Sequence, residues 1–154
     1  MIQLTFRQAT LQDLPELKRL FAETILETCK NEYTQGERIV WSNAIYKTEK
    51  WKIAVLEEYF IVAEYDEQIV GFSSLKGKDY LNLMYIHKEF TRHGIASLLY
   101  KKIKAKSLEF GAKQLTSDVS KTARPFFEKM GFKVIQENKN IIEDQVVINY
   151  KMSE

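Results

Sequence analysis

The sequence predicts a mixed α/β domain in which helices cover both faces of a mostly antiparallel sheet of six to seven strands. Runs with the alternation of half-buried strands and runs with helical spacing both occur along the chain. Three of the strands follow one another with short connections, which is typical of antiparallel neighbours. A long helical run then separates the fourth strand from the fifth, and such a crossover requires those two strands to be parallel.

The N-terminal third is predicted to hold one strand and two helices. Residues 2–7 alternate as in a half-buried strand. Thr10 with Asp13, and Thr34 with Glu37, have the spacing of capping boxes, so we expect a helix to begin after each pair. The apolar faces are Ile2, Leu4 and Phe6 for the strand, Leu14, Leu17, Phe21 and Ile25 for the first helix, and Val40, Trp41, Ala44 and Ile45 for the second.

The middle of the chain is predicted to hold three strands and a long helix. Asp66 and Glu67 separate the first two strands as a tight hairpin turn. A basic loop follows the third of these strands, and Gly94 opens the helix. The strands are Tyr59–Tyr65, Gln68–Leu75 and Tyr80–Ile86, and the helix carries Ile95, Leu98, Leu99, Ile103 and Leu108 on one face.

The C-terminal part is predicted to hold three strands and one helix. The helix ends at Gly131, which has the position of a left-handed C-terminal cap. The last two strands form a hairpin that is closed by a longer loop through Asn140. The elements are a strand at Gln114–Asp118, a helix at Ala123–Met130, and strands at Lys133–Glu137 and Val146–Met152.

The composition is that of a globular protein, and we expect a single domain over residues 1–154. The net charge of +2 is too small to indicate nucleic acid or a membrane surface as the main partner. The single cysteine, Cys29, excludes an internal disulfide and is typical of a reducing compartment. We expect neither a secretory leader nor a membrane span, and we expect a cytoplasmic location. We also expect no metal, since the two histidines and Cys29 form no ligand pattern.

The loop before the long helix has the pattern of an anion site. Arg92 and His93 are basic, and Gly94 begins the helix. The first amides of a helix have no partner inside it, and the helix dipole puts partial positive charge there. Gly94 lacks a Cβ and lets a phosphate approach the backbone, while Ala96 keeps the helix start thin. This pattern favours a pyrophosphate ligand.

Two motifs around Gly94 and Gly131 extend this interpretation. The first is Thr91-Arg92-His93-Gly94-Ile95-Ala96, and the second runs from Ser120 to Phe132 as S-K-T-A-R-P-F-F-E-K-M-G-F. In this order, and with these elements around them, they resemble the GNAT N-acetyltransferase superfamily. That family has Gln/Arg-x-x-Gly-x-Gly/Ala and Asn-x-x-Ala-x-x-Phe-Tyr-x-x-x-Gly-Phe. Thr91 therefore replaces Gln or Arg, Ser120 replaces Asn, and Phe127 replaces Tyr.

The resemblance implies that acetyl-CoA is a co-substrate that binds between the fourth and fifth strands. Its pantetheine arm would pair with backbone groups of the fourth strand, and its pyrophosphate would lie on the loop and helix start. The residues implied in binding are Met84, Tyr85, Ile86, Arg92, His93, Gly94, Ile95, Ala96, Ser97, Ser120 and Phe127.

The resemblance further implies N-acetyl transfer to a primary amine, by direct attack within a ternary complex. A phenyl ring at Phe127 cannot donate the proton that the family tyrosine is assigned, so Ser120 and Tyr33 are the candidate donors to the CoA thiolate. Asp118 is the preferred general base. Residues 29–33 and Trp41 are expected to cover the acceptor side, where Glu32 could attract a cationic amine.

Other interpretations stay open. A small molecule or a peptide could be the acceptor, and a homodimer is one option for assembly. The replaced residues at positions 91 and 127 also fit a non-catalytic acyl-CoA-binding or sensing module, and a structural partner-binding domain is a third hypothesis. Each candidate residue also has a purely structural interpretation. Gly94 could be a turn glycine, Ser120 could cap a helix, Asp118 could be stabilised by the nearby start of a helix, and Trp41 could be a core residue.

Overall fold

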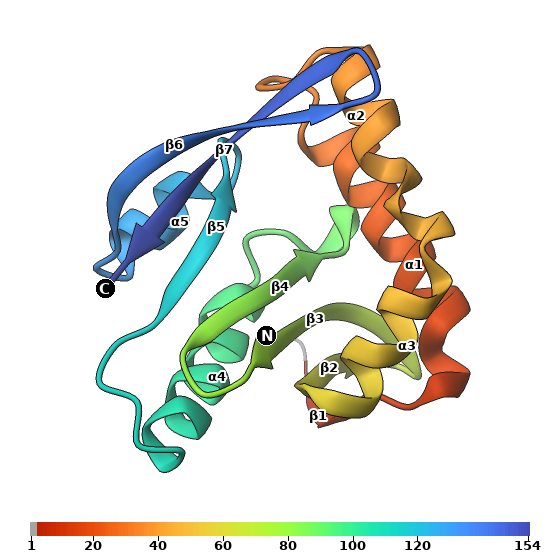
Figure 1. The fold of residues 1–154 in the computed structure, drawn as a ribbon. Helices are drawn as coiled ribbons and strands as arrows, with labels where there is room; N and C mark the ends of the chain where they lie inside the picture. The colour runs from red at the N-terminus through yellow and green to blue at the C-terminus, as the bar shows by residue number, and fades with distance from the viewer. Residues whose placement is uncertain (1–2) are drawn as a thin grey trace.

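A computed structural model describes residues 3–154 as a seven-stranded sheet with helices on both faces (Figure 1). The strand order is β1-β2-β3-β4-β5-β7-β6, and only β4 and β5 are parallel neighbours. The predicted fold class is therefore confirmed. The strands are β1 (Thr5–Gln8), β2 (Tyr59–Tyr65), β3 (Gln68–Lys76), β4 (Tyr80–Ile86), β5 (Thr116–Ser120), β6 (Lys133–Ile142) and β7 (Gln145–Ser153). The helices are α1 (Leu14–Glu23), α2 (Gln35–Ser42), α3 (Thr48–Glu57), α4 (Ile95–Glu109) and α5 (Arg124–Lys129).

Alternation along the strands directs side chains into two separate cores. Phe60 and Phe72 point to the face that α1 and α3 cover. Ile61 and Leu75 point to the opposite face, where α4 and α5 pack. Both faces of the central strands are thus apolar, which explains why β3 is buried along almost its whole length.

The N-terminal predictions are largely confirmed. Both capping boxes, Thr10 with Asp13 and Thr34 with Glu37, are present. The first begins a short 3-10 turn, η1 (Leu11–Asp13), that leads into α1, and α1 continues into a π-helical segment, η2 (Thr24–Thr28). Strand β1 begins at Thr5, and Ile2, which was predicted to share its face, lies outside the described residues.

Helix α3 was not predicted. Its buried residues are Trp51, Ala54 and Val55, yet Ile53 and Leu56 are exposed. Apolar residues therefore lie on both sides of this helix, and no single stripe at helical spacing marks it in the sequence. None of the helices in residues 3–154 combines the length and apolar character that a membrane span needs.

The limits of the C-terminal strands differ from those predicted. Strand β5 begins and ends two residues later than predicted, which places Ser120 at the strand end. The β6–β7 hairpin is longer than predicted and is closed at Glu143–Asp144, so the loop expected through Asn140 is wrong and Asn140 belongs to β6. On α4, Leu98 and Leu108 are exposed although both were placed on its apolar face. The left-handed conformation of Gly131 after α5 is confirmed by its φ of 99°.

Candidate active site

Strands β4 and β5 separate soon after they meet. They pair at Tyr80 and Thr116 and then diverge (Figure 1). On its other side β4 carries a bulge, because Asn82 is an extra residue between the two positions that oppose Ser74 and Leu75. A bulge increases the local twist of a strand. The bulged strand therefore leans away from β5, and backbone groups of β4 lack a neighbouring strand.

The register of β4 determines which backbone groups face this opening. The His87 amide donates to the Val70 carbonyl of β3 at 2.8 Å. Groups that bond to one antiparallel neighbour recur at every second residue, so Tyr85 also directs its backbone to β3. The backbone groups of Met84 and Ile86 then face β5. The Ile86 carbonyl accepts a hydrogen bond from Thr24 Oγ1 at 3.0 Å, which leaves its amide and both groups of Met84 for an extended ligand.

The start of α4 presents free amides. The first helical hydrogen bond runs from the Leu98 amide to the Gly94 carbonyl at 3.1 Å, so the amides of residues 95–97 have no partner within the helix. Arg92 and Gly94 are both left-handed, with φ of 66° and 77°. Such turns gather amides into a concave anion site. A Cβ built at Gly94 would meet no atom of the described residues within 4 Å, so open space lies in front of the backbone.

The two basic residues of the loop lie differently. Arg92 lines the cavity beside the helix start, as does Thr91. His93 is exposed, is not among the residues that line the cavity in the described part of the chain, and lies 6.1 Å from the Phe90 ring. Arg92 is thus the basic side chain of this loop that can contact a ligand in the cavity, and His93 can contribute only through its backbone.

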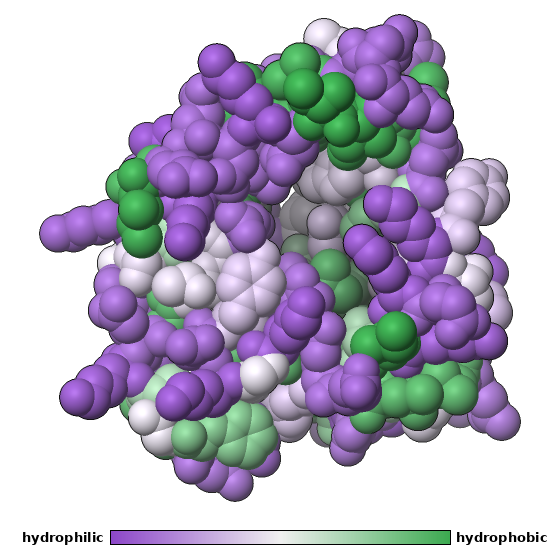
Figure 2. Space-filling view, in the orientation of Figure 1, coloured by the Kyte–Doolittle hydropathy of each residue, from purple (hydrophilic) through white to green (hydrophobic). Residues whose placement is uncertain are grey.

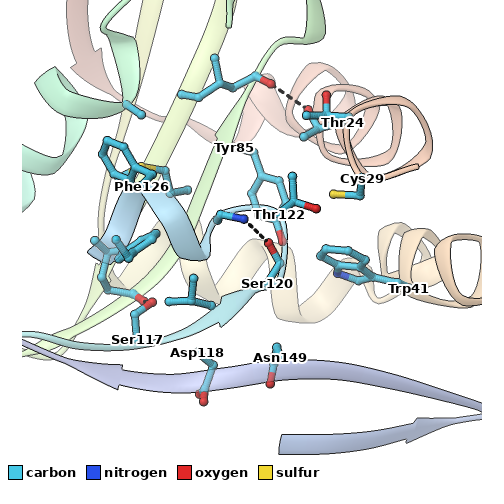
Figure 3. A pocket seen from close by; sticks show the side chains of 18 of the residues that line it. Thr24, Cys29, Trp41, Tyr85, Ser117, Asp118, Ser120, Thr122, Phe126 and Asn149 are labelled. Atoms are coloured by element: carbon cyan, nitrogen blue, oxygen red, sulfur yellow. Dashed lines mark hydrogen bonds between the residues drawn. The ribbon is translucent and has the colours of Figure 1, made fainter. Parts of the chain in front are cut away.

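One cavity of about 1230 Å³ connects this helix start with the opposite face of the sheet. This exceeds the roughly 300–1,000 Å³ of a site for one small ligand, so two substrates have room. Residues from β4, β5, α5, η2, α2 and the β6–β7 hairpin line it (Figure 3). Among the described residues that line it, Asp118 is the one carboxylate, against the cations Arg92, Lys129 and Lys139.

Asp118 is held by two donors. Its Oδ2 accepts from the Tyr80 hydroxyl at 2.6 Å, and its Oδ1 accepts from the side-chain Nδ2 of Asn138 at 2.8 Å. Burial, reinforced by the hydrogen bond to Asp118, raises the pKa of Tyr80, so this phenol stays a donor. Each carboxylate oxygen has a second lone pair, and the side chain is exposed to solvent. The carboxylate is therefore oriented and still able to accept a proton.

The two candidate proton donors are placed differently. Ser120 Oγ accepts from the Ala123 amide at 3.0 Å, which shapes the turn from β5 into α5 and leaves the hydroxyl proton free to donate (Figure 3). The Tyr33 hydroxyl donates to the Ile148 carbonyl at 2.5 Å and accepts from the Lys121 amide at 2.8 Å. Burial raises the pKa of Tyr33 to about 12. Tyr33 lines the cavity, but its hydroxyl is hydrogen-bonded to two backbone segments, β7 and the β5–α5 loop.

Phe127 and Glu32 also have defined environments. Phe127 is buried, lines the cavity and meets the Phe132 ring edge-on at 5.0 Å. Glu32 accepts a hydrogen bond from Thr122 Oγ1 at 2.7 Å. It ties the α1–α2 connection to the β5–α5 loop and is not among the described residues that line the cavity.

The side chain of Tyr85 was missed in the sequence. Only its backbone was expected to bind, yet its ring packs between Phe21, at 4.8 Å, and Phe72, at 5.6 Å, and lines the cavity. Figure 3 shows it beside Trp41 and Thr122. Burial raises the pKa of Tyr85, so its hydroxyl stays protonated. Alternation between neighbouring strand residues could have predicted that this side chain points away from that of Met84.

Comparison with known proteins identifies the architecture. A family model described as an acetyltransferase (GNAT) domain matches residues 29–153. The chain belongs to the GNAT acetyltransferase family. The uncharacterized N-acetyltransferase YafP of Escherichia coli is 30% identical over 128 residues, which cover 82% of this chain and 79% of that protein.

Solved GNAT structures share the whole fold. A GCN5-related N-acetyltransferase from Rhodopseudomonas palustris matches 100% of this chain and 97% of its own, with a TM-score of 0.94 and 23% identity. The PaiA N-acetyltransferase of Thermoplasma acidophilum, solved with coenzyme A, matches 99% of each chain with a TM-score of 0.81 and 20% identity. At these identities the likeness establishes the fold alone.

The site fits a CoA diphosphate by its own geometry. The space in front of Gly94, the free amides of residues 95–97 and the cation Arg92 all lie at one end of the cavity. Thr91, where the family has Gln or Arg, brings a hydroxyl to the same end. No group of three or more His, Cys, Asp or Glu residues within 3–154 is arranged to hold a metal ion.

Proposed function

We propose that this GNAT-family chain transfers the acetyl group of acetyl-CoA to a primary amine by direct attack in a ternary complex. The observation that carries the proposal is the single cavity, which joins the free amides at the start of α4 to Asp118 across the β4–β5 opening. The donor and the acceptor could thus enter from opposite faces of the sheet and meet beside Met84.

Backbone groups would position the donor. The amides of residues 95–97 and Arg92 would hold the pyrophosphate, and Met84 and Ile86 would pair with the pantetheine arm. A β4 amide would also donate to the thioester carbonyl oxygen as negative charge develops on it. Phe127 and Ser120 line the cavity near the β5–α5 turn, where they would adjoin the thiol end.

The chemistry needs two proton movements. Asp118 would remove a proton from the ammonium form of the acceptor, so that the neutral nitrogen can attack the carbonyl carbon and form the C–N bond. When the C–S bond breaks, the electron pair leaves with sulfur, and Ser120 could relay the second proton of the attacking nitrogen to this thiolate, which restores its own hydroxyl. The products are the acetylated amine and free CoA.

Release of free thiol tests the proposal. We expect thiol to appear only when both acetyl-CoA and an acceptor amine are present, with initial-rate lines that intersect, as for a ternary complex. Binding of CoA without thiol release on any amine would instead support the second candidate, a non-catalytic acyl-CoA-binding module. That candidate is motivated by Phe127, which cannot donate a proton. If CoA neither bound nor raised the melting temperature, both functions would be excluded.

A further inference from the structure

The acceptor side of the cavity is bridged by the protein itself. The cap segment, residues 29–42, is tied to β7 and to the β5–α5 loop by the hydrogen bonds of Tyr33 and Glu32. At the far end, the Gln145 side chain lies so close to Gly36 that a Cβ there would come within 3.1 Å of it. Figure 1 shows the β6–β7 hairpin reaching across to α2.

This bridging limits the shape of an acceptor. The cap segment and the hairpin are the two walls on this side, and their contacts with each other close the passage between them. Figure 2 shows a hollow in this face rather than a groove that crosses it. An extended polypeptide would have to break these contacts to lie across the site, whereas a compact molecule would not.

The interior of the bridged end is apolar and aromatic. Trp41 meets the Tyr33 ring at 5.2 Å and, with Val147 and Ile142, forms a small core between α2 and the hairpin. The Tyr85 ring lies beside Trp41 in Figure 3 and packs against the main core. We call Trp41 and Tyr85 the aromatic wall. Rigid rings of this kind bind flat or branched apolar groups with little loss of conformational entropy.

The charges in the cavity suit one positive group. Asp118 is the one carboxylate among the described lining residues, and Lys139 from the hairpin lines the same cavity. A single ammonium group can be neutralised by Asp118. A polyamine would bring further positive charges toward Lys139 without a second carboxylate to meet them.

We propose that the acceptor is a compact monoamine that carries an aromatic or branched apolar group, in preference to a polyamine or a polypeptide. The inference rests on the proposed acetyl transfer and adds the class of acceptor. Its amine lies toward Asp118, and its apolar group lies against the aromatic wall.

A panel of three amine classes tests the inference, with free-thiol release as the readout. The probes are 2-phenylethylamine, spermidine and a peptide with a free N-terminus and one lysine. We expect kcat/KM for 2-phenylethylamine to exceed the other two by about tenfold or more. Equal or better turnover of spermidine or the peptide would overturn the inference and leave acetyl transfer intact. No turnover of any amine, with CoA bound, would overturn both.

Two substitutions at Trp41 test the aromatic wall. Trp41→Leu should raise KM for 2-phenylethylamine about tenfold, and the milder Trp41→Phe, which keeps an aromatic ring in the core, should raise it less. KM for acetyl-CoA should stay unchanged in both. Ile39→Ala, on the exposed side of the same helix, is the matched control and should behave as the wild type. An unchanged KM for the amine in folded Trp41→Phe and Trp41→Leu would overturn the inference.

Discussion

Replacing Gly94 with alanine would separate ligand binding from folding. Gly94 and Gly111 lie at opposite ends of α4, with φ of 77° and 89°, and a Cβ at either would meet no atom of the described residues within 4 Å. A left-handed conformation costs an L-residue about 1–2 kcal/mol. We therefore expect Gly94→Ala and Gly111→Ala to lose similar stability, and both to stay folded because domains are stable by roughly 5–15 kcal/mol.

The two variants should differ in CoA binding. The new methyl group at position 94 would enter the space in front of the free amides, whereas Gly111 lies beyond the other end of the helix, whose 15 residues span about 22 Å. A hydrogen bond to a charged group contributes about 1.5–3 kcal/mol. Loss of one such bond would weaken binding roughly tenfold to a hundredfold. Gly111→Ala should keep the wild-type affinity.

Calorimetric titration with CoA and thermal melting of the same samples would measure both effects. The expected pattern is a matched fall in Tm of about 2–8 °C for the two variants, with weaker binding for Gly94→Ala alone. If the two variants bound CoA equally well, the left-handed glycine would be a fold residue only, and the assignment of the pyrophosphate site would be refuted.

Three further predictions concern the acceptor side and stability. Asp118→Asn should lower kcat about 10²- to 10³-fold with little change in KM for acetyl-CoA, because an amide accepts no proton; an unchanged kcat in steady-state assays would exclude it as the base. Tyr33→Phe should lower the free energy of unfolding in urea by about 1–3 kcal/mol and keep kcat, since it loses bonds to backbone; a large fall in kcat at normal stability would assign the phenol to proton transfer. The hydrogen bond from Arg7 lowers the pKa of Asp13, so the stability gained is complete above the unfolded-state pKa, about 3.9, and is lost as pH falls through the lower folded-state value. Asp13→Asn should flatten the fall of Tm in acid, and an unaltered pH profile would contradict this.

Structural features whose interactions all lie within a few residues of the chain could be predicted from the sequence. The capping boxes at Thr10 and Thr34 close over three residues, and the turn at Asp66–Glu67 needs only two left-handed residues, with φ of 52° and 64°. The turn at Gly94 is of the same kind, since its free amides, its left-handed glycine and Arg92 are neighbours in the chain. Local chemistry determines these features whatever the rest of the fold does.

Features that depend on residues far away in the sequence could not be predicted in this way. The Tyr33 hydroxyl bonds to backbone 115 and 88 residues away, and no local pattern distinguishes such a tyrosine from a proton donor. Helix α3 is stabilised where Trp51 packs on Phe21 and Phe72, at centroid distances of 5.2 and 6.2 Å, although its own sequence lacks a clear apolar stripe. In both cases tertiary contacts decide the role.

The distribution of polar groups in the cavity agrees with the steps of the proposed acetyl transfer that need catalysis. An ordinary amine of pKa near 10.4 is about 3.4 units above pH 7, so its deprotonation costs roughly 4.6 kcal/mol. A thiol of pKa near 8.5 leaves as thiolate at a cost of only about 2 kcal/mol. A base for the acceptor is therefore worth more than an acid for the leaving group. The chain holds Asp118 between Tyr80 and Asn138 on the side proposed for the acceptor, and at position 127 it has a buried phenyl ring that can donate no proton.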